Sequence, residues 1–159
     1  MKRKSERGVT QDELAALGSL AESLQTSRVR LHRGEPTGGA SRVLRALVLA
    51  MSQGRAVALG NHVFLPDHCA HSLPVVAHEL VHCAQYQAWG PLSYFARGAA
   101  ARVRELGARF GLARSPYAYE IEPGKPLSAY GMEQQAQIVE DCVRLAGTTR
   151  PPGPARGRL

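Results

Sequence analysis

The sequence predicts an α+β fold, because a few short strand-like stretches are combined with longer helical ones. Between residues 28 and 66, two stretches either alternate polar with apolar side chains or are rich in β-branched residues, as strands are. Elsewhere apolar residues recur every three or four positions, which is the period of a helix face. The 159 residues, 44% hydrophobic and 21% charged, suit a single globular domain with a buried core.

The first half of the chain is expected to alternate helix and strand. Residues 10–13, TQDE, form a capping-box pattern, and the apolar side chains after it follow helical spacing to Leu24. Residues 28–32, RVRLH, alternate polar and apolar side chains and predict a strand that ends at GEPTGG. Ser41 is then expected to cap a second helix that runs to about Met51.

A hairpin and a long helix are predicted next. Residues 55–66 hold two strand-like runs around Gly60-Asn61, and Pro66 ends the second run. The following helix begins near Pro74, a favourable residue for a first turn, and ends at about Trp89 before Gly90-Pro91.

The second half is expected to be mostly helical. Residues 92–114, with five arginines and one glutamate, predict an amphipathic helix or a pair of helices. Residues 115–129 contain three prolines and predict a loop, and residues 130–146 predict the last helix. We therefore expect a basic flexible N-terminus over 1–9, one domain over 10–147, and a disordered Pro/Arg-rich tail over 148–159.

The net charge of +7 lies mainly at the two ends of the chain. Residues 1–8 and 150–159 carry +3 each, whereas residues 9–149 carry only +1. A nucleic-acid-binding core needs its positive charge on the fold itself, so no specific nucleic-acid partner is expected.

The sequence shows neither a secretory signal nor a transmembrane segment. The charged start, MKRKSERGVTQDE, is not followed by an apolar h-region, and the most apolar stretch is interrupted by arginines. The three cysteines form no CxxC pair, which favours a reducing compartment. We expect a cytoplasmic protein, with export by a specialised secretion machine as the route that would need no signal peptide.

The residues His78-Glu79-Leu80-Val81-His82 predict a metal site on the helix that begins near Pro74. Positions four apart lie on one face of a helix, so both imidazoles can point at one ion. Glu79 lies about 100° round the helix axis, where its carboxylate reaches a metal-activated water rather than the metal. Burying three such side chains in an apolar helix is costly without a partner, and a metal ion supplies one.

A third ligand is needed, because catalytic zinc usually has three protein ligands and a water. The metzincin extension is excluded, since Gln85 and Ala88 stand where glycine and histidine are required. As the third ligand, a glutamate of the last helix is favoured over three other histidines, His62, His68 and His71. Glu133 is preferred to Glu140, because Ala136 would let its helix approach closely.

The pairing of AHELVHCAQYQ with YGMEQQAQIVED resembles the gluzincin group of zinc peptidases. More closely, residues 28–146 resemble the bacterial zincin-like core domain found beside extracellular contractile injection systems and polymorphic toxins. The resemblance implies a small zincin-like domain with an HExxH helix, a short hairpin or sheet before it and a C-terminal ligand-bearing helix. It also implies one Zn²⁺ held by His78, His82 and Glu133, with Glu79 as the general base that hydrolyses peptide bonds.

The resemblance leaves the surroundings of the metal open. Gluzincins commonly place an acidic residue four positions after the ligand glutamate, but this chain has Gln137 there, and Asp141 is the expected substitute one turn further on. Among the tyrosines near the last helix, Tyr119 and Tyr130 are expected to stabilise the transition state, and Tyr117 is a further candidate. Gln85 is expected to bond across the helix pair.

Two functions follow from these expectations. The first is a zinc metallopeptidase that acts on a peptide or protein and is linked to a secretion or toxin system. The alternative is a non-catalytic docking module of such a system, in which the metal only stabilises the fold. Two imidazoles and a carboxylate also suit nickel, cobalt or iron, so zinc is the expected metal rather than the required one.

Overall fold

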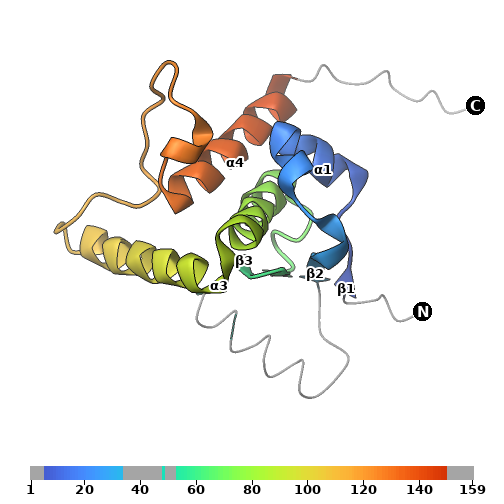
Figure 1. Ribbon diagram of the computed structural model, residues 1–159, viewed down its shortest axis with the longest axis horizontal. Coiled ribbons are helices and arrows are strands. Elements are labelled where there is room, and N and C mark those ends of the chain that lie inside the picture. The colour runs from blue at the N-terminus through green and yellow to red at the C-terminus, as the bar shows by residue number, and fades with distance from the viewer. Residues whose placement is uncertain (1–5, 34–47, 49–52, 150–159) are drawn as a thin grey trace, which may run out of the picture.

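The computed structural model describes residues 6–33, 48 and 53–149. These residues form a small α+β domain, as predicted, with three helices and a four-stranded mixed sheet (Figure 1). In chain order the elements are β1 (Glu6–Arg7), α1 (Gln11–Leu17), the 3-10 turns η1 (Gly18–Ser23) and η2 (Thr26–Arg28), β2 (Arg30–Arg33), β3 (Val57–Leu59), β4 (His62–Leu65), α3 (Leu73–Arg109), the 3-10 turn η3 (Leu127–Ala129) and α4 (Met132–Thr149).

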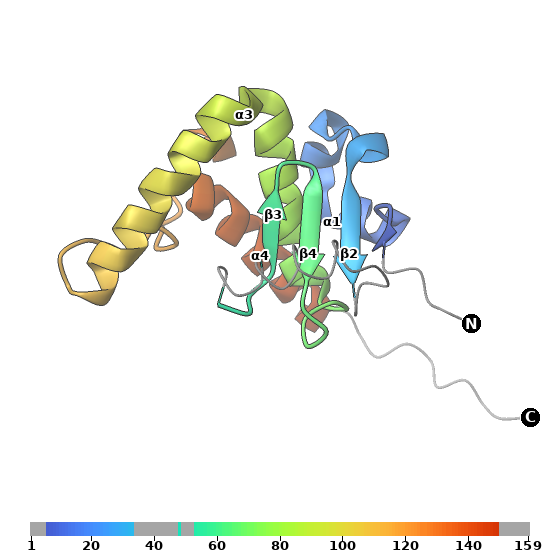
Figure 2. The same cartoon turned by 90° about the horizontal axis from the view of Figure 1, so that it is seen from below.

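The sheet has the strand order β1-β2-β4-β3. β2 runs parallel to β4, and the β1–β2 and β3–β4 pairs are antiparallel. The predicted hairpin is confirmed as β3 and β4, with Val57 opposite Phe64 and Leu59 opposite His62. β3 is therefore an edge strand of the described sheet. Figure 2 shows the strands in front of α1 and α3, so these helices lie on one face of the sheet.

The core lies between the sheet and α3. Alternation along the strands turns one face of each toward the helix, and these inward residues are fully covered. On α3, apolar positions at helical spacing meet them, and α4 closes the other side of that helix. The largest side chains with under 2% exposure are Leu31, Leu65, Leu80, Val29, Val63, Val76, Val81 and Cys83.

The capping box at the start of α1 forms as expected. Thr10 Oγ1 accepts a hydrogen bond from the Glu13 N–H at 3.3 Å, and Glu13 Oε2 accepts one from the Thr10 N–H at 2.9 Å. The helix does not continue to Leu24, which corrects the prediction. Gly18 has φ 57°, so the α-helix ends at Leu17 and the chain continues as η1, although Leu17 and Leu24 are both buried.

Helix α3 has two halves, which we call the inner half (residues 73–89) and the outer half (residues 92–109). Gly90, with φ 75° and ψ 166°, is not helical and kinks the element, and Pro91 follows it. The predicted break at Gly90-Pro91 is thus confirmed. The outer half ends at Arg109 rather than near residue 114, because Gly111 takes φ 72° and the Leu112 N–H bonds back to the Gly107 carbonyl at 2.8 Å.

The ends of the described chain are more regular than the sequence predicted. Glu6 and Arg7 form β1 within the stretch expected to be flexible, since Arg7 pairs with the carboxylate of Glu13. α4 extends to Thr149, beyond the predicted boundary at residue 147. The helix predicted from Ser41 to Met51 lies outside the described residues, apart from Val48, which is helical and buried. No helix among the described residues has the length and apolarity to cross a membrane.

Gly60 provides a test of the hairpin. Its φ of +63° disfavours any side chain, and an added Cβ would stand 3.1 Å from Tyr86 Cζ. We expect Gly60→Ala to lower the free energy of unfolding by about 2–3 kcal/mol, measured by urea denaturation. Gly124→Ala is the matched control, because Gly124 has φ +79° with open space around it, and should cost about 1 kcal/mol. Equal losses in the two variants would show that Tyr86 does not constrain the turn.

Candidate metal centre

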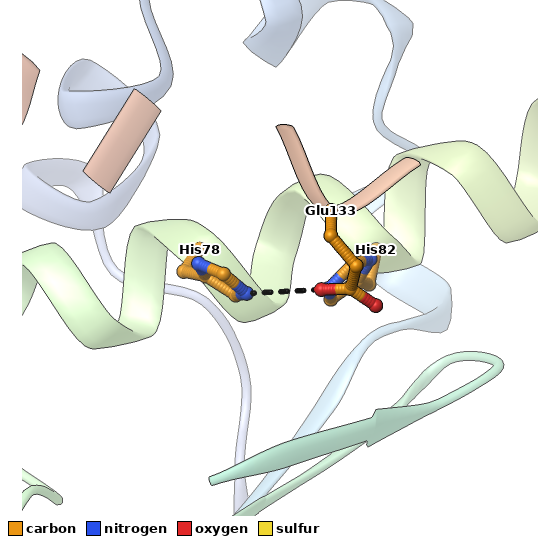
Figure 3. Close-up of side chains that lie close together, drawn as sticks. All are labelled: His78, His82 and Glu133. Carbon is orange, nitrogen blue, oxygen red and sulfur yellow. Dashed lines mark ion pairs between the residues drawn. The ribbon is translucent and has the colours of Figure 1, made fainter. Parts of the chain in front are cut away.

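Three side chains from two helices converge beside the sheet edge. His78 and His82 lie one turn apart on the inner half of α3, and Glu133 lies in the first turn of α4 (Figure 3). Glu133 Oε2 is 3.8 Å from His78 Nε2 and 3.3 Å from His82 Nε2. Ala136, one turn after Glu133, is fully buried, and its small side chain allows the close approach of the two helices.

The three donors fit a divalent metal ion. One donor atom from each residue can be chosen so that all lie within 4.8 Å of one another. Bonds of about 2.1 Å to a tetrahedral ion place neighbouring donors about 3.4 Å apart, close to the distances from Glu133 to both imidazoles. Two imidazole nitrogens and one carboxylate oxygen are also a common ligand set of catalytic zinc. The sequence-predicted ligands are therefore brought together.

Gln85 fixes the orientation of His82. Its Nε2 donates to the Met132 carbonyl at 3.0 Å and to Gln135 Oε1 at 3.1 Å, so its Oε1 is turned toward the imidazole. That oxygen lies 2.8 Å from His82 Nδ1 and accepts a hydrogen bond from the Nδ1–H, so in the neutral imidazole the lone pair is on Nε2, which faces Glu133. Gln85 thus bonds across the helix pair, as expected, and also selects the tautomer that a metal ligand needs.

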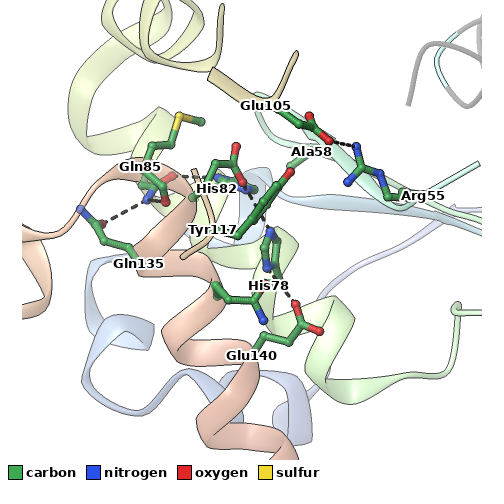
Figure 4. A network of polar contacts seen from close by, with 12 residues as sticks. Arg55, Ala58, His78, His82, Gln85, Glu105, Tyr117, Gln135 and Glu140 are labelled. Atoms are coloured by element: carbon green, nitrogen blue, oxygen red, sulfur yellow. Dashed lines mark hydrogen bonds and ion pairs between the residues drawn. The ribbon is translucent and has the colours of Figure 1, made fainter. Parts of the chain in front are cut away.

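Glu140 lies next to His78 on the side of the ring that faces away from Glu133. Its Oε2 is 3.0 Å from His78 Nδ1, although out of line for a hydrogen bond, and its other oxygen pairs with Arg144 (Figure 4). Gln137 and Asp141 were the residues expected in this position. Gln137 donates to Asp141 Oδ1 at 3.0 Å, so these two side chains bond each other rather than a histidine.

The tyrosines expected to stabilise a transition state have different surroundings. Tyr119 donates to Asp141 Oδ2 at 2.7 Å, and Tyr130 Oη accepts from the Glu122 N–H at 2.9 Å, so neither faces the metal centre. Tyr117 lines the cleft, with its ring centroid 6.5 Å from that of His78. All three tyrosines lie in or beside one proline-rich loop, and no sequence pattern distinguishes the one that turns inward.

Glu79 is buried and faces the sheet edge rather than α4. Only 6% of the residue is exposed, and burial raises the pKa of its carboxyl against the lowering effect of the two imidazoles. The backbone N–H of Ala58, on β3, donates to it. The carboxylate is therefore held at the boundary between the three donors and the edge strand.

The three candidate ligands perturb one another strongly. Burial alone would lower the pKa of His78, but Glu133 and Glu140 outweigh it and raise that pKa to about 10. The pKa of His82 is also raised, because Glu133 outweighs burial. Burial opposes but does not prevent a large fall in the pKa of Glu133 beside two imidazoles. Without an ion, the cluster therefore holds a protonated His78 that is ion-paired with the Glu133 carboxylate.

The metal centre opens into a cleft of about 620 Å³. One wall is β3, and the facing wall is the outer half of α3. Arg55 holds the walls together through a 2.9 Å ion pair with Glu105, and the Tyr94 hydroxyl donates to the Ala58 carbonyl at 2.9 Å. Both outward backbone groups of Ala58 are therefore engaged, the carbonyl by Tyr94 and the N–H by Glu79.

The other histidines do not join the metal cluster of the described chain. His68 lines the cleft together with Cys69. His71 Nδ1 lies 3.2 Å from Arg33, and His62 Nδ1 lies 3.0 Å from His32 Nε2.

Comparison with known families links part of the chain to a described domain. Residues 18–90 match the sequence model of the eCIS core domain. The matched region covers slightly less than half of the chain, includes His78, Glu79 and His82, and ends before Glu133. No curated protein and no solved structure matches the chain. The match agrees with the family that the sequence motifs resemble.

Glu140 and Asp141 form a matched pair for testing the metal surroundings. Glu140→Gln should weaken Zn²⁺ binding about tenfold, because the charge next to His78 Nδ1 is lost. Asp141→Asn should leave the affinity within about twofold, since Asp141 contacts Tyr119 and Gln137 instead. Competition with a chromophoric chelator measures both, and the reverse ranking would restore the expectation drawn from the sequence.

The ion pairs also predict how the stability of the metal-free protein depends on pH. The pKa of His78 rises on folding from its ordinary value of 6.5 to about 10. The stabilisation that protonated His78 gives the folded state is therefore complete below pH 6.5 and is lost as pH rises toward 10. The contribution of Glu133, whose pKa falls on folding, is complete above 4.5 and is lost in acid. Chelator-treated protein should therefore have its highest melting temperature between pH 4.5 and pH 6.5, and a melting temperature roughly 5 °C or more lower near pH 10.

Glu133→Gln isolates the source of that pH dependence. Without the carboxylate, the histidines lose the partner that raises their pKa values, so the fall in melting temperature above pH 6.5 should become shallower. An identical slope in wild type and variant would show that other groups cause it.

Proposed function

We propose that this chain is a metal-dependent peptidase of the zincin type that works with a contractile injection system. The observation that carries the proposal is the convergence of two imidazole Nε2 atoms on Glu133 Oε2, beside a buried glutamate and at the base of a cleft. The eCIS core domain match supports the link to an injection system. Export by such a machine would need no signal peptide.

His78, His82 and Glu133 would hold the ion, and zinc is the metal that this donor set favours. When bound, the ion lowers the pKa of water and polarises the carbonyl of the scissile bond. Gln85 orients the imidazole of His82 by a hydrogen bond, and the Glu140 carboxylate places negative charge 3.0 Å from His78 Nδ1, so that Nε2 of each histidine faces Glu133.

Glu79 is the residue proposed to move the proton. Burial raises the pKa of its carboxyl above the ordinary value, which suits a group that must both accept and return a proton. It takes a proton from the attacking water, whose oxygen forms the new bond to the peptide carbonyl carbon. The same proton then passes to the amide nitrogen, which leaves as the amine when the C–N bond breaks.

Tyr117 is the side chain placed to assist at the carbonyl oxygen. Its ring lies 6.5 Å from that of His78 and its hydroxyl accepts a hydrogen bond from Arg55. Burial and the nearby Glu133 raise the pKa of its phenol, so it stays a hydrogen-bond donor. The role expected for Tyr119 and Tyr130 is proposed for Tyr117 instead.

A peptide substrate is expected to lie along β3, whose outer edge faces the cleft. In the present arrangement the Ala58 carbonyl is occupied by the Tyr94 hydroxyl, so a peptide backbone that pairs there must displace this bond. Tyr94 therefore competes with the substrate.

The central test of the mechanism is Glu79→Gln. This variant should keep its zinc, since Glu79 is not among the three converging donors, but should lose about 10²–10⁴-fold in the rate of peptide hydrolysis. Elemental analysis and cleavage of a quenched-fluorescence peptide library measure the two properties. Glu120→Gln removes an exposed carboxylate and should leave both unchanged. Full activity of Glu79→Gln would exclude Glu79 as the base.

The competition at Ala58 gives a second test. Tyr94→Phe removes the hydroxyl that occupies the carbonyl, so KM for peptides should fall about 2–10-fold while kcat changes little. Tyr86→Phe is the control, because the Tyr86 ring packs edge-to-face on Tyr94 at a centroid distance of 5.4 Å. A higher KM in Tyr94→Phe would mean that the hydroxyl helps to bind substrate.

The alternative is a non-catalytic docking module in which the metal stabilises the fold. The occupied outer edge of Ala58 favours it, because a site that never receives a peptide would keep these contacts permanently. Both functions predict that chelation lowers the melting temperature. Zinc-loaded wild type with no more hydrolysis than Glu79→Gln would support the docking module.

A further inference from the structure

The outer half of α3 exposes a continuous apolar stripe. Leu92 is 87% exposed, Val103 69% and Phe110 77%, which is unusual for side chains of this size. Spacings of three and four residues place these side chains on one helix face. The stripe consists of Leu92, Phe95, Ala99, Val103, Leu106 and Phe110.

Phe95 lies at the edge of the stripe and packs on Tyr94, with ring centroids 5.2 Å apart, but Leu92, Val103 and Phe110 point away from the domain, because other side chains of the same helix face inward. Tyr94 is buried against Ala58, and Glu105 pairs with Arg55 just before β3. At 100° per residue, this inward face lies well over 90° round the axis from Leu92 and Val103. Figures 1 and 2 show the outer half of α3 projecting beyond the sheet, with no described element packed on its far side.

The charged residues of the same segment are almost all cationic. Residues 92–114 hold five arginines and one acidic residue, Glu105, which is already paired with Arg55, Arg102 and Arg109. Arg97 stacks on Trp89, with the guanidinium 4.4 Å from the ring centroid. Arg104 and Arg114 have no acidic partner within the described part of the chain. Round the helix axis, Arg102 and Arg109 lie next to the stripe on the cleft side, whereas Arg104 and Arg97 lie on its other side, more than 90° from Val103.

We propose that the outer half of α3 docks in the plane of an anionic lipid bilayer, with the stripe in the acyl boundary and the arginines at the headgroups. Exposed apolar side chains combined with flanking cations are the two attractions that bind an amphipathic helix to such a surface. The 18 residues of the outer half of α3 form a convex ridge about 27 Å long. The surface of a bilayer can deform around such a ridge without a preformed groove.

A second copy of the chain fits this face less well. Packing two such helices side by side brings arginines toward arginines, without carboxylates to neutralise them. An acidic protein partner would need a groove deep enough for this ridge. Charge and shape together favour the bilayer. Phe95 and Ala99 belong to the stripe and also line the cleft, so docking places the cleft mouth next to the membrane.

The test compares binding of the full chain to two vesicle populations, one of phosphatidylcholine alone and one with 30–40% phosphatidylglycerol. Co-sedimentation should show binding to the anionic vesicles only, weakening as salt rises. Val103→Asp/Leu106→Asp should reduce it at least tenfold, and Arg97→Gln/Arg104→Gln should reduce it several-fold. Leu145→Asp, which changes a leucine of α4 that is 66% exposed, is the matched control and should bind like wild type.

Each outcome decides the proposal. All changed side chains are exposed, so unchanged melting temperatures would show that losses of binding are not losses of fold. The proposal is overturned if wild type binds neither vesicle, or if Val103→Asp/Leu106→Asp binds as well as wild type. It is also overturned if lipid-free protein is a dimer that this variant dissociates and vesicle binding is absent, since the stripe would then be a self-association surface.

Discussion

The close packing of α4 against the inner half of α3 is the contact on which the centre depends. A helix pair this close needs a small residue at the crossing, and Ala136 supplies it with no exposed surface. One turn before it, Glu133 reaches both imidazoles. Side chains of this polarity are costly to bury singly, and the cost falls only when opposite charges, hydrogen bonds or a metal ion compensate it. The same helix pair therefore forms the site and stabilises its buried polar groups.

The histidine pair and its helix were predictable, because their spacing is local and the helical period is strong. The hairpin was also predictable, since Gly60 lies at the turn between two β-rich runs. The partner of His78 was not. Glu140 and Asp141 are neighbours on one helix, about 100° apart round its axis, and which carboxylate meets the imidazole is set by the packing of α4 on α3, which no local pattern records. The choice of Tyr117 over Tyr119 has the same origin, because a proline-rich loop is oriented by tertiary contacts alone.

The two halves of α3 serve different purposes in this account. The inner half is mostly buried and carries two of the three candidate metal donors, whereas the outer half forms one cleft wall and exposes its opposite face. Gly90 separates them, and the ion pair of Arg55 with Glu105 ties the outer half back to the edge strand. The cleft width is thus set by a few polar contacts rather than by a packed core, so substrate access depends on contacts that are individually weak.

The most direct measurement is anomalous diffraction at the zinc edge from crystals grown with zinc. We expect one strong peak within about 2.3 Å of Nε2 of both histidines and of a Glu133 oxygen, with the remaining coordination position open to the cleft. A peak bound by other side chains, or a structure in which the Glu133 carboxylate points into solvent away from both imidazoles, would contradict it.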